Sequence, residues 1–394
     1  PPIVGGVESV LGHYARLMAD AGHQVRIVAG RGEQTDPRIP FIHLPMADSR
    51  HPDVLAIKAE LDAGRVPPEF TEQVDALTAD LYEVLVGVNV LIAHNVCSLN
   101  KNLVLTAAVR NLVSHNHLRI ILWHHDLAWT TPRYSAELHD GHPWDLLRQA
   151  WAGVKQVTIS EMRQQELSEL FQISKDDIAV IPNGVDVAVF HQLEQQTRKY
   201  MKQLDLLRAS PLLLLPVRIT PRKNIELALR VCADLLQHFP DTKLVVTGPL
   251  GPHNPANVTY FEKLVALRKK LGLSNVVCFL AELTAEYLPD EIILDFYRLA
   301  DILFLPSREE GFGIPVLEAG LAGLPIFCSD IPPLRSLGGS DVTYFSPDAD
   351  PGGLASTIAH HLSSDPIFRM RARVRRQFSW ERIYTREIAP LLTE

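Results

Sequence analysis

The sequence has few cysteines, no long apolar run and no excess of positive charge. Its 394 residues include four cysteines, none of them in a C-x-x-C pair, which excludes a disulfide framework and favours reduced thiols in a cytoplasmic protein. No apolar stretch reaches about 18 residues and no signal peptide is visible, so no membrane-spanning helix is expected. The formal net charge of −8 argues against nucleic acid as the main partner, because nucleic-acid-binding proteins usually carry a basic surface.

Short apolar segments alternate with helical patterns along the whole chain. This alternation predicts an α/β fold with parallel, doubly wound sheets. The chain is long enough for two domains, and a polar stretch at residues 187–210 separates two similar halves. We therefore predict one domain over residues 1–195 and a second over 211–377. Strands are expected near residues 24–29, 39–44, 88–93, 119–123, 154–159, 178–181, 212–217, 243–247, 276–280, 302–305, 326–328 and 342–345.

The stretch from Ser307 to Asp330 carries the strongest chemical signal. Pro315 suits the first turn of a helix and Gly323 suits its end, so the loop Glu310–Gly313 presents free backbone N–H groups at a helix N-terminus, where an anion is favoured. Glu310 and Glu318 flank those N–H groups. Carboxylates beside an anion site fit a ligand with both phosphates and hydroxyls, such as a nucleotide sugar. The alternative is a buried β-α-β unit whose acids are only helix N-terminal charges.

Two cations follow the predicted strand at 212–217. Arg218 and Lys223 precede a strongly amphipathic helix that Asn224 could cap. Two cations at a helix N-terminus repel the helix dipole unless an anion lies between them. A diphosphate is a natural occupant, bound by the planar guanidinium and by the ammonium as a point charge. The alternative is a pair of exposed cations on a loop.

Further polar residues stand where predicted strands of the first half end. In parallel sheets ligands bind beyond the carboxyl ends of the strands, so these residues are expected to share one rim, although a histidine at a strand end is often structural. Two glycine positions, the Gly5-Gly6 loop and Gly248, allow a ligand to approach the backbone closely, with a plain turn as the alternative. The strand-end residues are His94, His124, His125, Asp126 and Asn183.

The motif Ser307-x-x-Glu310-Gly311-Phe312-Gly313-x-Pro315-x-x-Glu318 resembles the Glu-x7-Glu signature of retaining GT-B glycosyltransferases of family 4. The resemblance covers nearly the whole chain, is strongest from residue 212 to 346 and is looser before residue 120. It implies a GT-B fold, in which two Rossmann-like domains face a cleft and a C-terminal helix, here 378–394, crosses back onto the first domain. In that family a strand precedes the double-glycine loop, so we expect a missing N-terminal strand.

The resemblance also implies roles for individual residues. Arg218 and Lys223 match the family's Arg-x4-Lys phosphate pair, Glu310 would hold a donor-sugar hydroxyl, and Glu318 would accept hydrogen bonds from the ribose. His125-Asp126 resembles the strand-end site near the anomeric carbon and the acceptor, with His124 as an equal alternative for the histidine. The predicted catalytic set is His125, Asp126, Glu310, Arg218 and Lys223. The predicted substrate-binding set is Gly5, Gly6, His94, His124, Asn183, Gly248, Gly311, Phe312, Gly313 and Glu318.

The resulting expectation is a retaining, metal-independent transfer of a hexose from a nucleoside-diphosphate sugar to a hydroxyl of a sugar, glycerol-type or lipid-linked acceptor. No cofactor or metal is expected, because no D-x-D pair sits where a metal-dependent enzyme would need it. One alternative is a catalytically silent nucleotide-sugar-binding protein on the same fold, and another is an epimerase or phosphorylase. A nicotinamide-dependent oxidoreductase is disfavoured because no G-x-G-x-x-G run follows a strand.

Five arginines lie between Arg369 and Arg376. We interpret them as a solvated helix face, with contact to an anionic partner or a membrane surface as the alternative. One position departs from the family pattern, because Arg335 stands where many relatives carry glutamate. No role is transferred to it.

Overall fold

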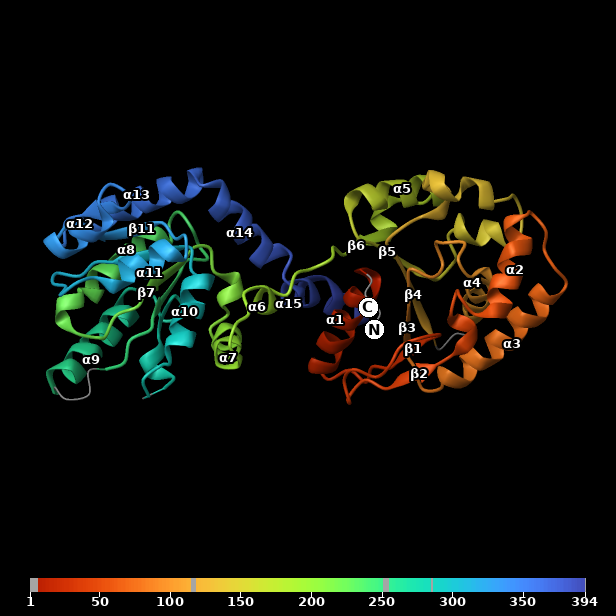
Figure 1. Cartoon of the computed structure of the whole chain (residues 1–394), viewed down its shortest axis with the longest axis horizontal. Helices are drawn as coiled ribbons and strands as arrows, with labels where there is room; N and C mark the ends of the chain where they lie inside the picture. The colour runs from red at the N-terminus through yellow and green to blue at the C-terminus, as the bar shows by residue number, and fades with distance from the viewer. Residues whose placement is uncertain (1–5, 115–117, 251–254, 285, 394) are drawn as a thin grey trace. The chain divides into compact units, whose positions relative to one another are not determined.

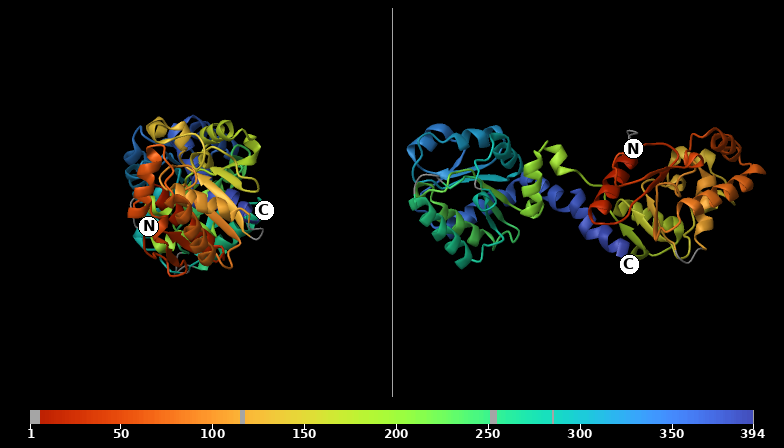
Figure 2. Two further views of the ribbon diagram at one scale, coloured as in Figure 1. Left: turned by 90° about the vertical axis from the view of Figure 1, so that its right-hand side faces the viewer. Right: turned by 90° about the horizontal axis from the view of Figure 1, so that it is seen from below.

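The computed structural model describes residues 6–114, 118–250, 255–284 and 286–393. The chain divides into two compact units (Figure 1), one formed by Pro1–Gly184 with Trp380–Glu394 and the other by Val185–Ser379. Each unit is built on parallel strands with helices on both faces, as the right-hand view of Figure 2 also shows. The predicted α/β class with parallel sheets is confirmed.

The first unit contains a four-stranded parallel sheet and a separate two-stranded one. The larger sheet has the order β3-β4-β5-β6. Its strands are β3 (Val90–His94), β4 (Arg119–His124), β5 (Lys155–Thr158) and β6 (Ile178–Val180), and β1 (Ile27–Ala29) pairs with β2 (Phe41–His43). The helices are α1 (Gly6–Asp20), α2 (Pro52–Asp62), α3 (Glu69–Val84), α4 (Leu103–Leu112) and α5 (Glu161–Phe171).

Strand β4 shows why this sheet is covered on both faces. Successive side chains of a strand point to opposite faces. Ile120 and Leu122 pack into a cluster with residues of α2, α3 and α4, whereas Ile121 and Trp123 pack with residues of α1 and of the C-terminal segment. A continuous apolar run is what a strand buried on both faces requires.

The last residues of the chain belong to the first unit. They form α15 (Trp380–Ile383), a π-helical turn (Tyr384–Ile388) and α16 (Ala389–Thr393). The Trp380 ring stacks on His13 of α1 with a centroid distance of 4.9 Å. Gly184 passes directly beneath Trp380, since a Cβ there would lie 2.6 Å from a ring carbon. This contact explains a glycine at the end of the first unit.

The second unit contains a six-stranded parallel sheet of order β12-β11-β10-β7-β8-β9. Its strands are β7 (Leu212–Leu215), β8 (Lys243–Val246), β9 (Val277–Phe279), β10 (Ile302–Leu305), β11 (Ile326–Ser329) and β12 (Thr343–Phe345). The helices are α6 (Val187–Phe190), α7 (Gln195–Gln203), α8 (Ile225–Leu235), α9 (Pro255–Lys270), α10 (Asp290–Leu299), α11 (Ile314–Leu321), α12 (Pro332–Gly338), α13 (Pro351–Ser364) and α14 (Pro366–Gln377). Residues 185–195 lie in this unit and not, as predicted, in the first, because Val187, Ala188 and Leu193 pack in its core.

The strand order of the second unit indicates where a ligand site is expected. From β7 the chain proceeds outward through β8 and β9, then returns to the other side of β7 with β10 and continues through β11 and β12. The direction in which successive strands are added to the sheet therefore reverses between β7 and β10. In open parallel sheets, ligands bind at such a switch point, beyond the carboxyl ends of the strands. The loops that follow β7 and β10 thus become the first place to look for a site.

Within the described part of the chain, no helix is both long and apolar enough to cross a lipid bilayer.

Candidate functional site

The loops after β7 and β10 are joined through their backbones. The backbone N–H of Arg308 donates to the carbonyl of Arg222 at 2.8 Å. The first loop then enters α8 through Asn224, which has a left-handed backbone (φ 51°). Contrary to the prediction, the Asn224 side chain does not cap the helix but donates to the carbonyl of Pro347 at 2.9 Å. Hydrogen bonds to neighbouring segments therefore fix the shape of the first loop.

Lys223 and Glu310 form an ion pair between these two loops. Lys223 Nζ lies 2.6 Å from Glu310 Oε1, and the two side chains are only 10% and 7% exposed. Ser307 Oγ donates to the same carboxylate oxygen at 2.7 Å. Removing two charges from water is costly, and their attraction offsets that cost only when the geometry is good and further hydrogen bonds are made. The second oxygen, Oε2, accepts no hydrogen bond from a described residue, which leaves it available to a ligand hydroxyl.

The two glycines of the loop after β10 serve different purposes. Gly313 is the N-cap of α11 at φ 108°, and a Cβ there would lie 2.5 Å from Leu334 Cδ2, so the fold itself requires glycine. A Cβ on Gly311 would meet nothing within 4 Å, so this glycine leaves open space over the loop. Phe312 between them is 57% exposed. The loop therefore offers an accessible backbone at the N-terminus of α11.

Glu318 lies on α11 and is half-buried. Its Oε2 accepts a hydrogen bond from the Tyr297 hydroxyl at 2.6 Å. The two predicted carboxylates therefore both accept hydrogen bonds from hydroxyls of the protein, and each keeps one oxygen without a donor among the described residues.

Arg218 and Gly248 complete the edge of the second unit. Arg218 is exposed, and its guanidinium makes no hydrogen bond or ion pair with any described residue. Gly248 follows β8, and a Cβ there would lie 1.9 Å from the carbonyl oxygen of Val217. The backbone after β8 thus lies directly against the backbone after β7, which explains this glycine by packing. A direct contact of Gly248 with a ligand stays a prediction.

In the first unit, His124 and His125 lie in different surroundings. His124 is 1% exposed, and its Nε2 lies 2.8 Å from Gln156 Oε1. Since that oxygen is an acceptor, Nε2–H is the donor. Burial lowers the pKa of His124 to about 4, and its ring packs edge-on against Phe171. This enclosed position does not support the predicted substrate contact of His124.

His125 instead packs against His94. Their ring centroids are 4.9 Å apart, and His94 stacks on Trp123 at 5.2 Å. Burial lowers the pKa of His125 and lowers that of His94 to about 3, so both rings are neutral at pH 7. Both ring nitrogens of His94 and the Nε2 atom of His125 are buried without a hydrogen-bond partner among the described residues. Buried polar atoms are rarely left unpaired, so these nitrogens are candidate partners for a ligand hydroxyl.

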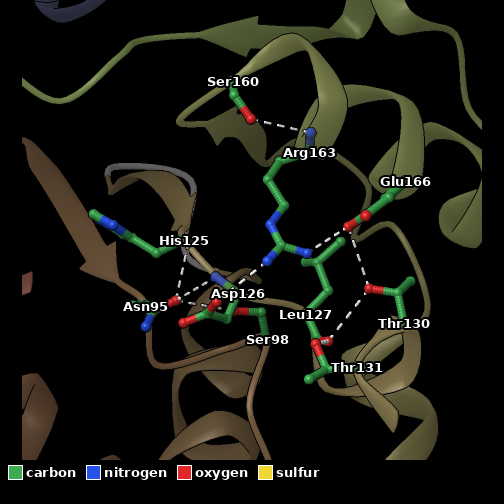
Figure 3. A network of polar contacts seen from close by, with 10 residues as sticks. All are labelled: Asn95, Ser98, His125, Asp126, Leu127, Thr130, Thr131, Ser160, Arg163 and Glu166. Atoms are coloured by element: carbon green, nitrogen blue, oxygen red, sulfur yellow. Dashed lines mark hydrogen bonds and ion pairs between the residues drawn. The ribbon is translucent and has the colours of Figure 1, made fainter.

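A polar network holds the His125-Asp126 segment (Figure 3). Asn95 has a left-handed backbone (φ 55°), and its Oδ1 accepts the backbone N–H groups of His125 at 3.0 Å and Asp126 at 3.3 Å. Arg163 Nη2 lies 3.4 Å from Asp126 Oδ1, while its Nη1 lies 2.6 Å from Glu166 Oε2. Neither Asn95 nor Arg163 was singled out from the sequence. An asparagine directly after a strand-end histidine was the available signal for the first, because asparagine tolerates this backbone conformation.

The remaining predicted residues lie at the edge of the first unit. Asn183 is exposed, and its side chain makes no hydrogen bond to a described residue. Gly6 begins α1 and is exposed, and a Cβ added there would meet nothing within 4 Å. Gly5 lies outside the described residues. Among the described side chains, no group of three or more His, Cys, Asp or Glu residues is arranged to hold a metal ion.

Two family models together match almost all of the chain. The model described as glycosyl transferases group 1 matches residues 196–377, and that described as glycosyltransferase family 4 matches residues 4–189. The chain is 30% identical over 177 residues to the D-inositol 3-phosphate glycosyltransferase of Nocardia farcinica, a match that covers 44% of this chain and only 36% of that relative.

Two further similarities span more of the chain. The mannosylglucosylglycerate synthase of Petrotoga mobilis is 25% identical over 324 residues, which cover 76% of this chain and 73% of that one. The crystal structure of Anabaena HepE in complex with UDP-glucose is 16% identical, with a TM-score of 0.37, and the alignment covers 100% of this chain and 98% of that one. From the two family models and the relatives matched by sequence, the chain belongs to the group 1 glycosyltransferases, glycosyltransferase family 4.

Proposed function

We propose that this protein is a retaining, metal-independent glycosyltransferase that moves a hexose from a nucleoside-diphosphate sugar to an acceptor hydroxyl. The observation that carries the proposal is the buried cluster of Lys223, Glu310 and Ser307 at the switch point of the second sheet. It combines a cation for phosphate with a carboxylate oxygen that is free to accept from a sugar hydroxyl. A purely structural ion pair does not require that combination beside an open backbone loop.

On the donor side, the second unit supplies the charge that a departing diphosphate needs. Arg218, exposed and without a partner among the described residues, is free to contact phosphate together with Lys223. The backbone N–H groups of residues 311–313 at the N-terminus of α11 add further donors. In the proposal these groups stabilise the leaving group in place of a metal ion. Glu310 holds a hydroxyl of the sugar, and Glu318 holds the ribose.

On the acceptor side, we assign the hydroxyl to the surroundings of His125 and Asp126. His125 is neutral, and its Nε2 has no hydrogen-bond partner among the described residues, which suits hydrogen bonding to a hydroxyl more than carrying charge. The bond between the anomeric carbon and the phosphate oxygen breaks, and the acceptor oxygen bonds to the same face of the sugar. The acceptor proton passes to the departing phosphate oxygen. The protein mainly positions the reactants and supports positive charge on the sugar.

For the acceptor we propose a class of compounds and not a single compound. The names of the relatives, D-inositol 3-phosphate glycosyltransferase and mannosylglucosylglycerate synthase, favour a hydroxyl-bearing acceptor such as a sugar or a glycerol-type compound, and a lipid-linked acceptor stays a prediction. We also propose that the reaction takes place in the cytoplasm. All four cysteines are free thiols, which supports this proposal.

The test is product formation with a panel of donors. The protein is incubated with UDP-glucose, UDP-N-acetylglucosamine or GDP-mannose and a mixture of polyol, sugar and glycerate acceptors. Released nucleoside diphosphate is measured, and the new anomeric configuration is determined by NMR. We expect one donor to give a product that keeps the donor's anomeric configuration, and a Glu310→Gln variant to lose turnover while the exposed neighbour variant Glu309→Gln keeps it. An inverted product, or full turnover by Glu310→Gln, would contradict the proposal.

The second candidate, a silent nucleotide-sugar-binding protein, shares the donor site and differs only in lacking turnover. Tight donor binding with no product from any acceptor in the panel would favour it.

A further inference from the structure

Tyr297 lies behind the proposed ribose-binding carboxylate. It is on α10, is 2% exposed, and packs in the core of the second unit. Its hydroxyl donates to Glu318 Oε2 at 2.6 Å. Burial, and then the adjacent Glu318 carboxylate, raise the pKa of Tyr297 far above its usual range. The hydroxyl therefore stays protonated and remains a donor at any physiological pH.

The hydrogen bond occupies one oxygen of Glu318 and leaves the other free. Oε1 of Glu318 accepts no hydrogen bond from the part of the chain that the structure describes, and the side chain is half-buried and reachable. A carboxylate on a helix surface otherwise samples several rotamers, and fixing one costs free energy when a ligand binds. A buried donor 2.6 Å away removes that cost before the ligand arrives, in the way that outer partners orient metal ligands.

We infer that Tyr297 is a positioning residue, which holds the Glu318 carboxylate ready to accept hydrogen bonds from the ribose hydroxyls of the donor nucleotide. This inference rests on the proposed function, because it needs a nucleotide in the second unit. The alternative is that this bond only provides the buried tyrosine hydroxyl with a hydrogen-bond partner. The two roles predict different effects of removing the Tyr297 hydroxyl on the preference for nucleotides with ribose hydroxyls over nucleotides without them.

The test compares nucleotides with and without those hydroxyls. Binding of UDP and GDP and of their 2′,3′-dideoxy counterparts is measured by isothermal titration calorimetry on the full chain and on two isosteric variants. Tyr297→Phe removes the donor and keeps the ring. Tyr200→Phe is the matched control, because Tyr200 is also buried in the second unit, at 4% exposure, and its hydroxyl makes no hydrogen bond with a described residue.

We expect the parent protein to prefer the ribose form of its nucleotide, and Tyr297→Phe to reduce that preference about tenfold, the size of a hydrogen bond to a charged group. Affinity for the dideoxy form stays unchanged, and Tyr200→Phe behaves like the parent. An unaltered preference in Tyr297→Phe overturns the inference and leaves the proposed function standing. A parent protein that binds neither UDP nor GDP overturns both, so the two failures are distinct.

Discussion

Replacing Glu310 with alanine leaves the Lys223 ammonium in the second unit without its counter-ion. The Lys223 side chain is 10% exposed, so water only partly restores its solvation. Removing one partner of a buried ion pair destabilises a protein by about 3–5 kcal/mol. We expect about 3 kcal/mol for Glu310→Ala, the lower end of that range, because the flexible four-carbon Lys223 side chain can turn its ammonium toward solvent. A Glu310→Gln variant should lose less, since it keeps an acceptor for Lys223 and Ser307.

The assay must report on the second unit alone. All five tryptophans belong to the first unit, so their fluorescence does not follow the second. Hydrogen exchange of peptides from β7 and β10 measures the opening free energy of the second unit directly. Glu309→Ala is the control, because Glu309 is exposed and makes no ion pair with a described residue.

A double variant separates the ion pair from its surroundings. Lys223→Met combined with Glu310→Leu removes both charges, and replacing a buried pair by apolar residues is often neutral. The double variant should therefore recover most of the stability lost in Glu310→Ala. If Glu310→Ala lowers the opening free energy by less than about 1 kcal/mol, the pair behaves as a surface salt bridge and the reasoning from its burial is refuted.

Three further predictions concern the glycines, pH and the polar network. Gly248→Ala should lower stability by about 3 kcal/mol, because its Cβ would lie 1.9 Å from a backbone oxygen, whereas Gly311→Ala should leave thermal unfolding unchanged and weaken nucleotide binding; equal unfolding temperatures for both variants would contradict this. Burial lowers the pKa of His124 to about 4, against about 6.5 in an unfolded chain. Its stabilising contribution is therefore present above pH 6.5 and lost as the pH falls to 4. Tryptophan fluorescence melts should show a first unit that is less stable at pH 5 than at pH 7, with about 2 kcal/mol of the drop due to His124 and the rest to His94 and His125, whose pKa values burial also lowers; His124→Gln should remove only the His124 share. Asn95→Ala should cost about 2 kcal/mol in the same melts because two backbone N–H groups lose their acceptor, while Asn95→Asp keeps an acceptor and should cost less; equal losses would argue against the network.

The strand positions could be predicted because they depend on local pattern. The apolar runs at 212–217 and 302–305 are β7 and β10 within a few residues. The contact between Lys223 and Glu310 was not predicted, although both residues were singled out. Their meeting depends on β10 returning to the side of β7, and strand order is set by the packing of the whole sheet and not by either segment.

The two histidines at the end of β4 were harder to predict. His124 and His125 are neighbours in the sequence, yet one hydrogen-bonds to Gln156 while the other packs on His94. The local sequence pattern predicts that the two side chains point in different directions. It does not predict which of the two histidines is more deeply buried.

The arginine-rich segment shows a similar limit. The interpretation as a solvated face is wrong for Arg375, which is 6% exposed and lies 2.6 Å from the buried Asp301. Its partner is 74 residues away in the sequence, so the charge pattern of the helix alone gave no sign of this ion pair.

The most direct measurement of the donor site is hydrogen exchange on the full chain with and without saturating UDP or GDP. We expect one of these nucleotides to protect peptides covering residues 216–224 and 306–318, and the protection to be lost in the Arg218→Ala/Lys223→Ala variant. Protection elsewhere in the second unit, with these two loops unchanged, would contradict the assignment of the site.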